Sequence, residues 1–122
     1  MKKLIEFKEI KHTDILRSMI DYMNFDEYDD FDCGYTQKEI DKCGKILDDY
    51  IDELEKCRKD EKLIKKQLKK VILKLNKLNE SCDSSLIETD QREYLCPFIE
   101  DAAVAAGLTK SEEDITLEWR EW

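Results

Sequence analysis

Histidine is the side chain that most often activates a serine, cysteine or threonine nucleophile, and this chain of 122 residues contains one, His12. His12 stands just ahead of a predicted helix, where we expect a surface position. A glycine-rich phosphate loop is also missing, since the chain has three scattered glycines. The sequence therefore predicts no catalytic residues, no cofactor and no enzymatic activity.

The segment FDEYDDFDCGY, residues 25–35, is the densest group of possible metal ligands in the chain. A calcium loop with Gly34 at its sixth position would place Phe31 third and Ile40 twelfth, and neither side chain carries an oxygen ligand. Carboxylate sites for two metals in helical bundles use Glu-x-x-His motifs, and the sequence has none. We therefore expect no metal site and interpret this segment as a linker, called the acidic linker below.

The acidic linker also has the composition of a protein-binding surface. It holds five acids among four aromatic residues, so carboxylates would steer a basic partner while the rings supply buried anchors. In the alternative interpretation the rings pack inward and the acids only keep the domain soluble. The residues of this hypothetical binding site are Asp26, Glu27, Tyr28, Asp29, Asp30, Phe31, Asp32 and Tyr35.

A second polar group, residues 88–93, precedes an apolar helical pattern. In a structural interpretation Thr89 and Asp90 cap the helix, and Arg92 is held by Glu88 or by Glu118 or Glu121 of the last residues. In a functional interpretation, residues 90–92 form a recognition surface. We favour the structural one, with a polar cluster of Glu88, Thr89, Asp90 and Arg92.

Charge is distributed unevenly along the chain. The formal net charge is −9, yet residues 61–81 carry seven lysines and two acids. We expect these lysines to form a solvated face or to pair with acids of neighbouring helices. Aromatic residues for base stacking are not interleaved with them, and the acidic balance of the chain disfavours phosphate binding, so no nucleic-acid partner is predicted.

The cysteines and the first residues both bear on the compartment. Five cysteines, an odd number, are spaced 10, 14, 25 and 14 residues apart. Disulfide frameworks and zinc sites are more closely clustered, so we expect free thiols that pack as small apolar side chains. The start, MKKLIEFKE, has no apolar signal-peptide core, and no stretch is apolar enough to span a bilayer. These features predict a cytoplasmic protein without a membrane partner.

Hydrophobic residues recur at helical spacing through most of the chain. The pattern predicts four principal helices near residues 13–24, 37–58, 61–79 and 87–106, while residues 4–11 fit a helix or a strand. Thr36 and Glu39 match a capping box at the start of the strongest helix. The apolar repeat predicts a buried face of Ile40, Cys43, Leu47, Tyr50, Ile51, Leu54, Cys57, Leu63, Ile64, Leu68, Val71, Ile72, Leu75 and Leu78.

The two central helices either turn back on one another or join into one. A single helix of this length would need a partner along its whole seam. We therefore predict an antiparallel hairpin that turns at residues 58–60; one unbroken helix would instead require an obligate dimer.

The last third of the chain predicts a helix with a docked tail. Tyr94 and Leu95 belong to its predicted buried face, Pro97 should kink it, and Gly107 is placed to end it. The tail offers Ile115, Leu117, Trp119 and Trp122. Such apolar area is seldom left on a frayed terminus, so we expect the tail to pack on the fold.

The tracts LNKLNESC, LIETDQRE, AAGL and DITLEWREW, from Leu75 onward, resemble a tract of small, uncharacterised bacterial helical proteins. The resemblance covers about the last 48 residues. It implies an all-helical fold and a bacterial cytosolic setting, and it implies no activity.

These features together predict one all-α domain, residues 1–122, built as a small bundle of about four main helices with a long central antiparallel hairpin. The function expected is non-enzymatic protein binding, with an immunity-type protein that neutralises a basic partner as the specific form. The alternative is a structural or assembly protein that forms a homodimeric helical bundle, supported by the long apolar repeat.

Overall fold

The chain folds as a bundle of helices in this computed structural model, which describes residues 3–10, 14–23, 35–82, 84, 86–109 and 115–122. Within these residues no strand occurs, and the predicted all-α class is confirmed. The helices are α1 (Leu4–Ile10), α2 (Leu16–Met23), α3 (Gln37–Lys56), α4 (Glu61–Ser81) and α5 (Thr89–Ala106).

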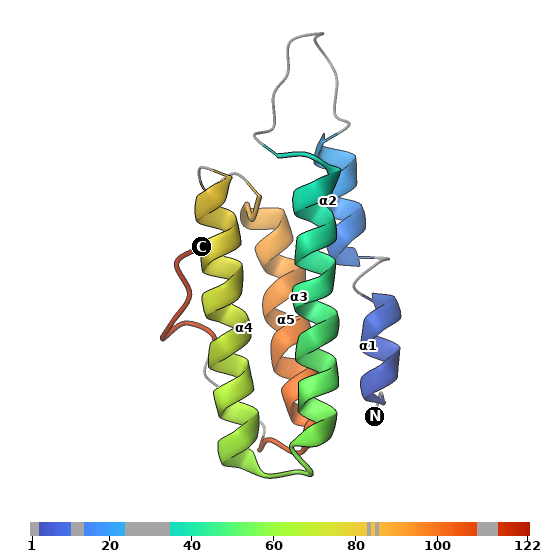
Figure 1. The fold of residues 1–122 in the computed structure, drawn as a ribbon, viewed down its shortest axis with the longest axis vertical. Coiled ribbons are helices and arrows are strands. Elements are labelled where there is room, and N and C mark those ends of the chain that lie inside the picture. Colours follow the sequence, from blue (N-terminus) through green and yellow to red (C-terminus); the bar gives the residue numbers. More distant parts are fainter. Residues whose placement is uncertain (1–2, 11–13, 24–34, 83, 85, 110–114) are drawn as a thin grey trace, which may run out of the picture.

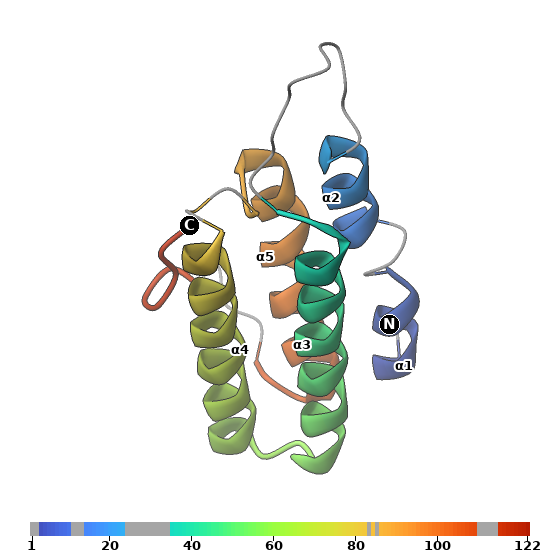
Figure 2. The ribbon, with the colours of Figure 1, turned by 45° about the horizontal axis from the view of Figure 1, so that its top comes forward.

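The two longest helices, α3 and α4, run antiparallel side by side, and α5 lies against both (Figures 1 and 2). The predicted hairpin is therefore confirmed. Its turn is made by Arg58 and Lys59, whose φ angles of 48° and 64° are in the left-handed region. Asp60 then starts α4, because its Oδ1 accepts hydrogen bonds from the backbone N–H groups of Lys62 (3.0 Å) and Leu63 (3.4 Å).

The first two helices pack along α3 and α5 (Figure 1). The ambiguous stretch at residues 4–11 forms a helix at Leu4–Ile10. Phe7 is the reason this helix docks: it is 3% exposed, and its ring meets the ring of Phe98 edge-on with centroids 5.6 Å apart.

The start of α3 follows the predicted capping box. The N–H of Thr36 donates to Oε2 of Glu39 at 2.9 Å, and the Thr36 hydroxyl donates to the same oxygen. These bonds lower the pKa of Glu39. The capping box therefore fixes the first turn of α3.

The apolar repeat of α3 and α4 is buried as predicted, with one exception. Leu63 is 44% exposed, because it stands about 100° around the helix from the buried Ile64. In α5 Tyr94 is 46% exposed, which corrects its predicted place in the core. The repeat residues that are buried are Ile40, Cys43, Leu47, Tyr50, Ile51, Leu54, Cys57, Ile64, Leu68, Val71, Ile72, Leu75 and Leu78.

Helix α5 continues through Pro97 to Ala106 and is capped by Gly107. The N–H groups of Gly107 and Leu108 donate to the carbonyls of Val104 and Ala103, each at 3.0 Å, a pairing in which a glycine with positive φ closes the helix. Gly107 has a φ of 124° and lies directly against Lys59 of the hairpin turn. The end of α5 is thereby fixed to the α3–α4 turn.

A second contact ties this end of α5 to α4. Oε1 of Glu61 accepts a hydrogen bond from the backbone N–H of Thr109 at 2.9 Å, and the Thr109 hydroxyl donates to the same oxygen. These hydrogen bonds lower the pKa of Glu61. The Glu61 carboxylate is therefore ionised at neutral pH, the state in which it accepts both bonds best.

The C-terminal segment, residues 115–122, docks beside α4 (Figure 1). Asn76 holds it: its Nδ2 donates to the carbonyl of Trp119 at 2.7 Å, and its Oδ1 accepts from the N–H of Glu121 at 3.1 Å. Ile115, Trp119 and Trp122 pack partly buried against the core, whereas Leu117 is 63% exposed. The tail is thus docked, but Leu117 does not take part as expected.

Among the described helices, none has the length and apolar composition needed to cross a membrane.

Candidate functional site

The acidic linker lies mostly outside the described residues. Asp26, Glu27, Tyr28, Asp29, Asp30, Phe31 and Asp32 belong to the part of the chain that is not described. Tyr35 is described and is 6% exposed, and its hydroxyl donates to the carbonyl of Met19 at 2.9 Å. Tyr35 therefore joins α2 to the start of α3, which corrects its assignment as a partner contact.

The polar cluster at the start of α5 differs from the expected arrangement. The helix is capped at Glu88, not Thr89, and the N–H of Glu88 donates to Oε1 of the buried Gln91 at 3.0 Å. Thr89 and Asp90 are exposed. The half-buried Arg92 side chain makes no ion pair within the described residues, so it does not clamp the tail.

Contacts to the C-terminal segment come from other residues of α4 and α5. Besides the Asn76 bonds, Oε1 of Glu100 accepts from the N–H of Ile115 at 3.1 Å, and Nη1 of Arg120 lies 2.8 Å from Sγ of Cys96. At the end of the segment, the Glu80 carboxylate raises the pKa of Glu121, because protonated Glu121 can donate a hydrogen bond to it and the two like charges repel. No local pattern predicts these partners, because each of them is at least 15 residues away from its contact in the tail.

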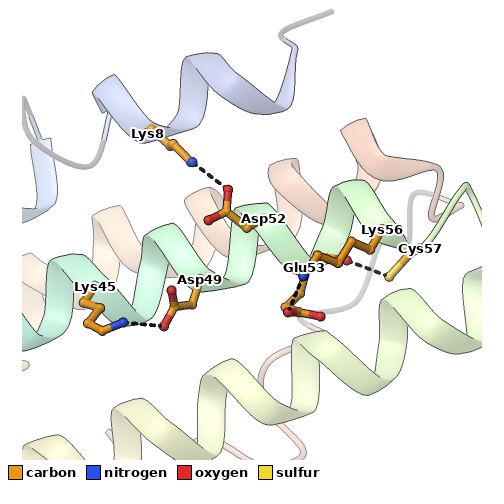
Figure 3. A network of polar contacts seen from close by, with 7 residues as sticks. All are labelled: Lys8, Lys45, Asp49, Asp52, Glu53, Lys56 and Cys57. Carbon is orange, nitrogen blue, oxygen red and sulfur yellow. Dashed lines mark hydrogen bonds and ion pairs between the residues drawn. The ribbon is translucent and has the colours of Figure 1, made fainter.

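Three acids on α3 form ion pairs with lysines of the same chain. Nζ of Lys8 in α1 lies 2.6 Å from Oδ1 of Asp52, and within α3 Lys45 pairs with Asp49 and Lys56 with Glu53 (Figure 3). The Asp52 carboxylate raises the pKa of Lys8. These carboxylates are therefore weak candidates for attracting a partner.

Acids on the outer side of α5 are in a different state. Asp90, Glu93 and Asp101 are exposed, and none of them forms an ion pair within the described part of the chain. Positions 90, 94, 97 and 101 follow the spacing of one helix face. We call this set, Asp90, Glu93, Tyr94, Pro97 and Asp101, the α5 acidic surface.

The α5 acidic surface starts at Asp90, in the first turn of α5. Helix α5 begins at the end of the bundle where α2 ends and α3 begins, and the linker connects those two helices (Figure 1). The exposed Tyr94 ring gives the surface a large apolar anchor among carboxylates. A surface of this kind suits recognition of a positively charged protein.

Helix α4 presents the opposite charge. All of its lysines are exposed, and within the described residues none of them forms an ion pair. The predicted solvated lysine face is therefore observed, without pairing to acids of neighbouring helices. Its members are Lys62, Lys65, Lys66, Lys69, Lys70, Lys74 and Lys77.

Three of the described thiols are packed in the core and one is partly accessible. Cys43, Cys57 and Cys82 are buried, whereas Cys96 is half-buried and touches Arg120. Burial raises the pKa of Cys43 to about 12, so its reactive thiolate is essentially unpopulated at neutral pH. Cys57 donates to the carbonyl of Glu53 at 3.2 Å (Figure 3).

A Cys33→Ser variant, which removes the one thiol outside the described residues, should show a single accessible thiol. We expect Cys96 to react first with a bulky disulfide reagent, because the other three remaining thiols are buried whereas Cys96 is partly accessible. Kinetics of thiol release, followed by absorbance, measure this. A Cys33→Ser, Cys96→Ser double variant is the control and should react only after denaturant is added; rapid labelling of the double variant would contradict this placement of the core.

Within the described residues, no group of three or more His, Cys, Asp or Glu side chains is placed to hold a metal ion. Sequence reasoning placed Tyr94 in the core and so missed the α5 acidic surface. The signal available was the spacing of Tyr94 from Asp90 and Asp101, which puts all three on one helix face.

Comparisons of this chain with protein-family models, with curated proteins and with solved structures found no match.

Proposed function

We propose that this chain is a non-enzymatic protein-binding domain whose partner is a basic protein. The α5 acidic surface supports this proposal most directly, because its carboxylates are exposed and form no ion pair within the described residues, whereas Asp49, Asp52 and Glu53 of α3 are engaged in ion pairs. The acidic linker, which stands between α2 and α3 in the sequence, is the second acidic segment in this proposal.

Electrostatics and packing have separate roles in this proposal. Carboxylates at the rim of an interface speed the encounter with a positive partner, and their effect falls as salt screens them. An exposed aromatic residue such as Tyr94, 46% exposed, supplies apolar area that becomes buried on binding. The acids thus set the rate of association, and Tyr94 contributes to the lifetime of the complex.

An immunity-type role, in which the chain neutralises a basic toxin, is the specific form of this proposal. The net charge of −9 supports it. The alternative function, a homodimeric assembly protein, was favoured by the long apolar repeat. That repeat is used within the chain, since its residues on α3 and α4 are buried against one another.

Neutralising the α5 acidic surface should slow partner binding. The partner is first captured from the native host on the immobilised chain and identified by mass spectrometry. We expect the variant Asp90→Asn, Glu93→Gln, Asp101→Asn to reduce its association rate constant by about tenfold at low salt and to flatten the salt dependence. Surface plasmon resonance at several ionic strengths measures both effects.

The matched control changes the same number of charges on α3. Asp49→Asn, Asp52→Asn, Glu53→Gln removes acids that are already paired, so the association rate should change much less. A linker variant, Asp29→Asn, Asp30→Asn, Asp32→Asn, tests the contribution of the acidic linker. A captured partner that is not basic, or whose association ignores both variants and added salt, would refute the proposal.

A further inference from the structure

The outer side of α4 carries an exposed apolar residue between two lysines. Leu73 is 46% exposed. The exposed Lys66 stands seven positions before it and the exposed Lys77 four positions after it, spacings that place all three on one helix face. Neither lysine forms an ion pair in the part of the chain that the structure describes. We call Lys66, Leu73 and Lys77 the α4 stripe.

The C-terminal segment docks on α4 without covering the α4 stripe. It is bonded to Asn76 and lines a groove with Leu68, yet Leu73 stays 46% exposed. The nearest carboxylate on the same face of α4 is Glu80, which stands beyond Lys77 and faces Glu121 of the segment. The stripe therefore offers an apolar centre flanked by positive charge.

The α5 acidic surface repeats this pattern with the opposite charge. Tyr94 is also 46% exposed. The exposed Asp90 stands four positions before it and the exposed Asp101 seven positions after it. Among the described residues neither carboxylate is in an ion pair. Each helix thus has one exposed apolar side chain between two charges of one sign.

The two patterns coincide when the helices lie antiparallel. Each helix places one charge about 6 Å from its apolar residue along the axis and the other about 10 Å away on the opposite side, at 1.5 Å per residue. Because the order of the short and long spacings is reversed, an antiparallel pair brings every member opposite its complement. The three layers of this contact are Tyr94 on Leu73, Asp90 on Lys77 and Asp101 on Lys66.

The contact requires two molecules. Within one chain α4 and α5 pack through their buried sides, and no ion pair among the described residues joins the α4 stripe to the α5 acidic surface. The exposed residues of the two helices therefore face away from their shared interface, where another copy of the chain has access to them.

We propose that the α4 stripe binds the α5 acidic surface of a second copy of this chain, with the two helices antiparallel and Tyr94 against Leu73. A phosphate backbone or an anionic lipid surface would attract the lysines, but neither presents an apolar group between two negative charges at the matching spacing. Each copy uses α5 toward one neighbour and α4 toward the next, which is a heterologous contact.

This inference rests on the proposed function for its acidic surface and adds a form of regulation to it. A second copy seated on the α5 acidic surface covers the carboxylates that would meet a basic partner. Self-association and partner binding then compete. Exposed ion pairs are individually weak, so the self-association is easily displaced.

Sedimentation equilibrium of the full chain at about 10 µM to 1 mM tests the proposal. Each copy has a net charge of −9, so the measurement uses about 0.1 M salt, where a Debye length of about 10 Å screens the long-range repulsion. We expect the weight-average mass to rise with concentration. The variants Lys66→Glu, Lys77→Glu and, separately, Asp90→Lys, Asp101→Lys should each weaken self-association by about tenfold or more.

Mixing the two reversed chains gives the decisive measurement. In the mixture the glutamates on α4 of one chain meet the lysines on α5 of the other, and the unchanged faces also match. The mixture should therefore associate within about threefold of the parent chain, although each variant alone does not. Self-association that survives both reversals, a mixture that fails to associate, or a parent chain that is monomeric throughout the range would overturn the proposal.

The controls match each change in charge and exposure. Lys38→Glu, Lys42→Glu makes the same change in net charge with exposed lysines of α3 and should leave self-association within about twofold of the parent chain. Leu73→Ser should weaken it by about fivefold, whereas Ile5→Ser, which removes a side chain 65% exposed on α1, should not. Equal effects of the two serine variants would count against a contact at Leu73.

Neutral variants separate this inference from the proposed function. Lys66→Gln, Lys77→Gln keeps the α5 acidic surface, and it replaces the glutamate variant if circular dichroism shows that the latter is not folded. It should self-associate less than the parent chain and bind a basic partner at least as tightly, because no second copy competes. A basic partner bound by a chain that never self-associates would refute this inference alone, and self-association without any basic partner would refute the proposed function alone.

Discussion

Truncation after Asp114 should lower the free energy of unfolding by roughly 3–5 kcal/mol. It removes the partly buried Ile115, Trp119 and Trp122 and both hydrogen bonds to Asn76. Because domains are normally stable by only about 5–15 kcal/mol, the melting temperature should fall by roughly 10–20 °C. Urea unfolding and thermal melts followed by circular dichroism measure the loss.

A double-mutant cycle identifies the contribution of Asn76. In the full chain Asn76→Ala leaves the Trp119 carbonyl and the Glu121 N–H without their partner, and we expect a cost of about 2 kcal/mol. In the truncated chain the same substitution should lower the free energy of unfolding much less, because the Trp119 carbonyl and the Glu121 N–H that Asn76 binds are absent. The cycle also cancels the gain in helix propensity from alanine. An unchanged melting temperature after truncation would mean that the tail does not contribute to the fold.

Gly107→Ala should destabilise the protein by roughly 2–4 kcal/mol. The φ of 124° at Gly107 is strained for any other residue, and an added Cβ would lie 2.9 Å from Cβ of Lys59. Both effects act where the end of α5 meets the hairpin turn. Chemical denaturation of the purified variant measures the change.

Lys59→Gly tests the contact between these two positions. Alone it should stabilise the protein by about 0.5–1 kcal/mol, because Lys59 has a positive φ of 64°. Combined with Gly107→Ala it should recover part of the loss, although the Lys59 Cα would remain 3.0 Å from the new Cβ. Ser84→Gly is the matched control: Ser84 also has a positive φ, of 61°, but is not among the close neighbours of Gly107. A direct contact between Gly107 and Lys59 would be contradicted if the coupling free energy of Gly107→Ala were the same with Ser84→Gly as with Lys59→Gly.

The central hairpin was predictable because its signals are local. Apolar spacing from Ile40 to Leu78 marks one face of each helix, and the capping box at Thr36 marks the first turn of α3. The chain length then favoured a turn over one long helix. The left-handed Arg58 and Lys59 that make the turn were not predictable, since neither is a residue type that prefers positive φ.

Residues 4–11 and Tyr94 show where local pattern was insufficient. The first stretch fitted a helix or a strand until Phe7 was placed against Phe98, a residue 91 positions away in sequence. Tyr94 fitted the apolar pattern of α5, but the neighbours of α5 cover its other side. Burial of one residue in a long pattern is decided by which helices pack nearby.

The sequence by itself determined the all-α class, the positions of the main helices, the antiparallel hairpin and the lysine face of α4, because helical periodicity and charge are properties of neighbouring residues. The tertiary structure alone decided that Asn76 holds the C-terminal segment, that Gly107 meets Lys59, and that α4 and the tail enclose a groove. These features join residues more than 40 positions apart, and their geometry depends on how the helices pack, which spacing along one helix does not encode.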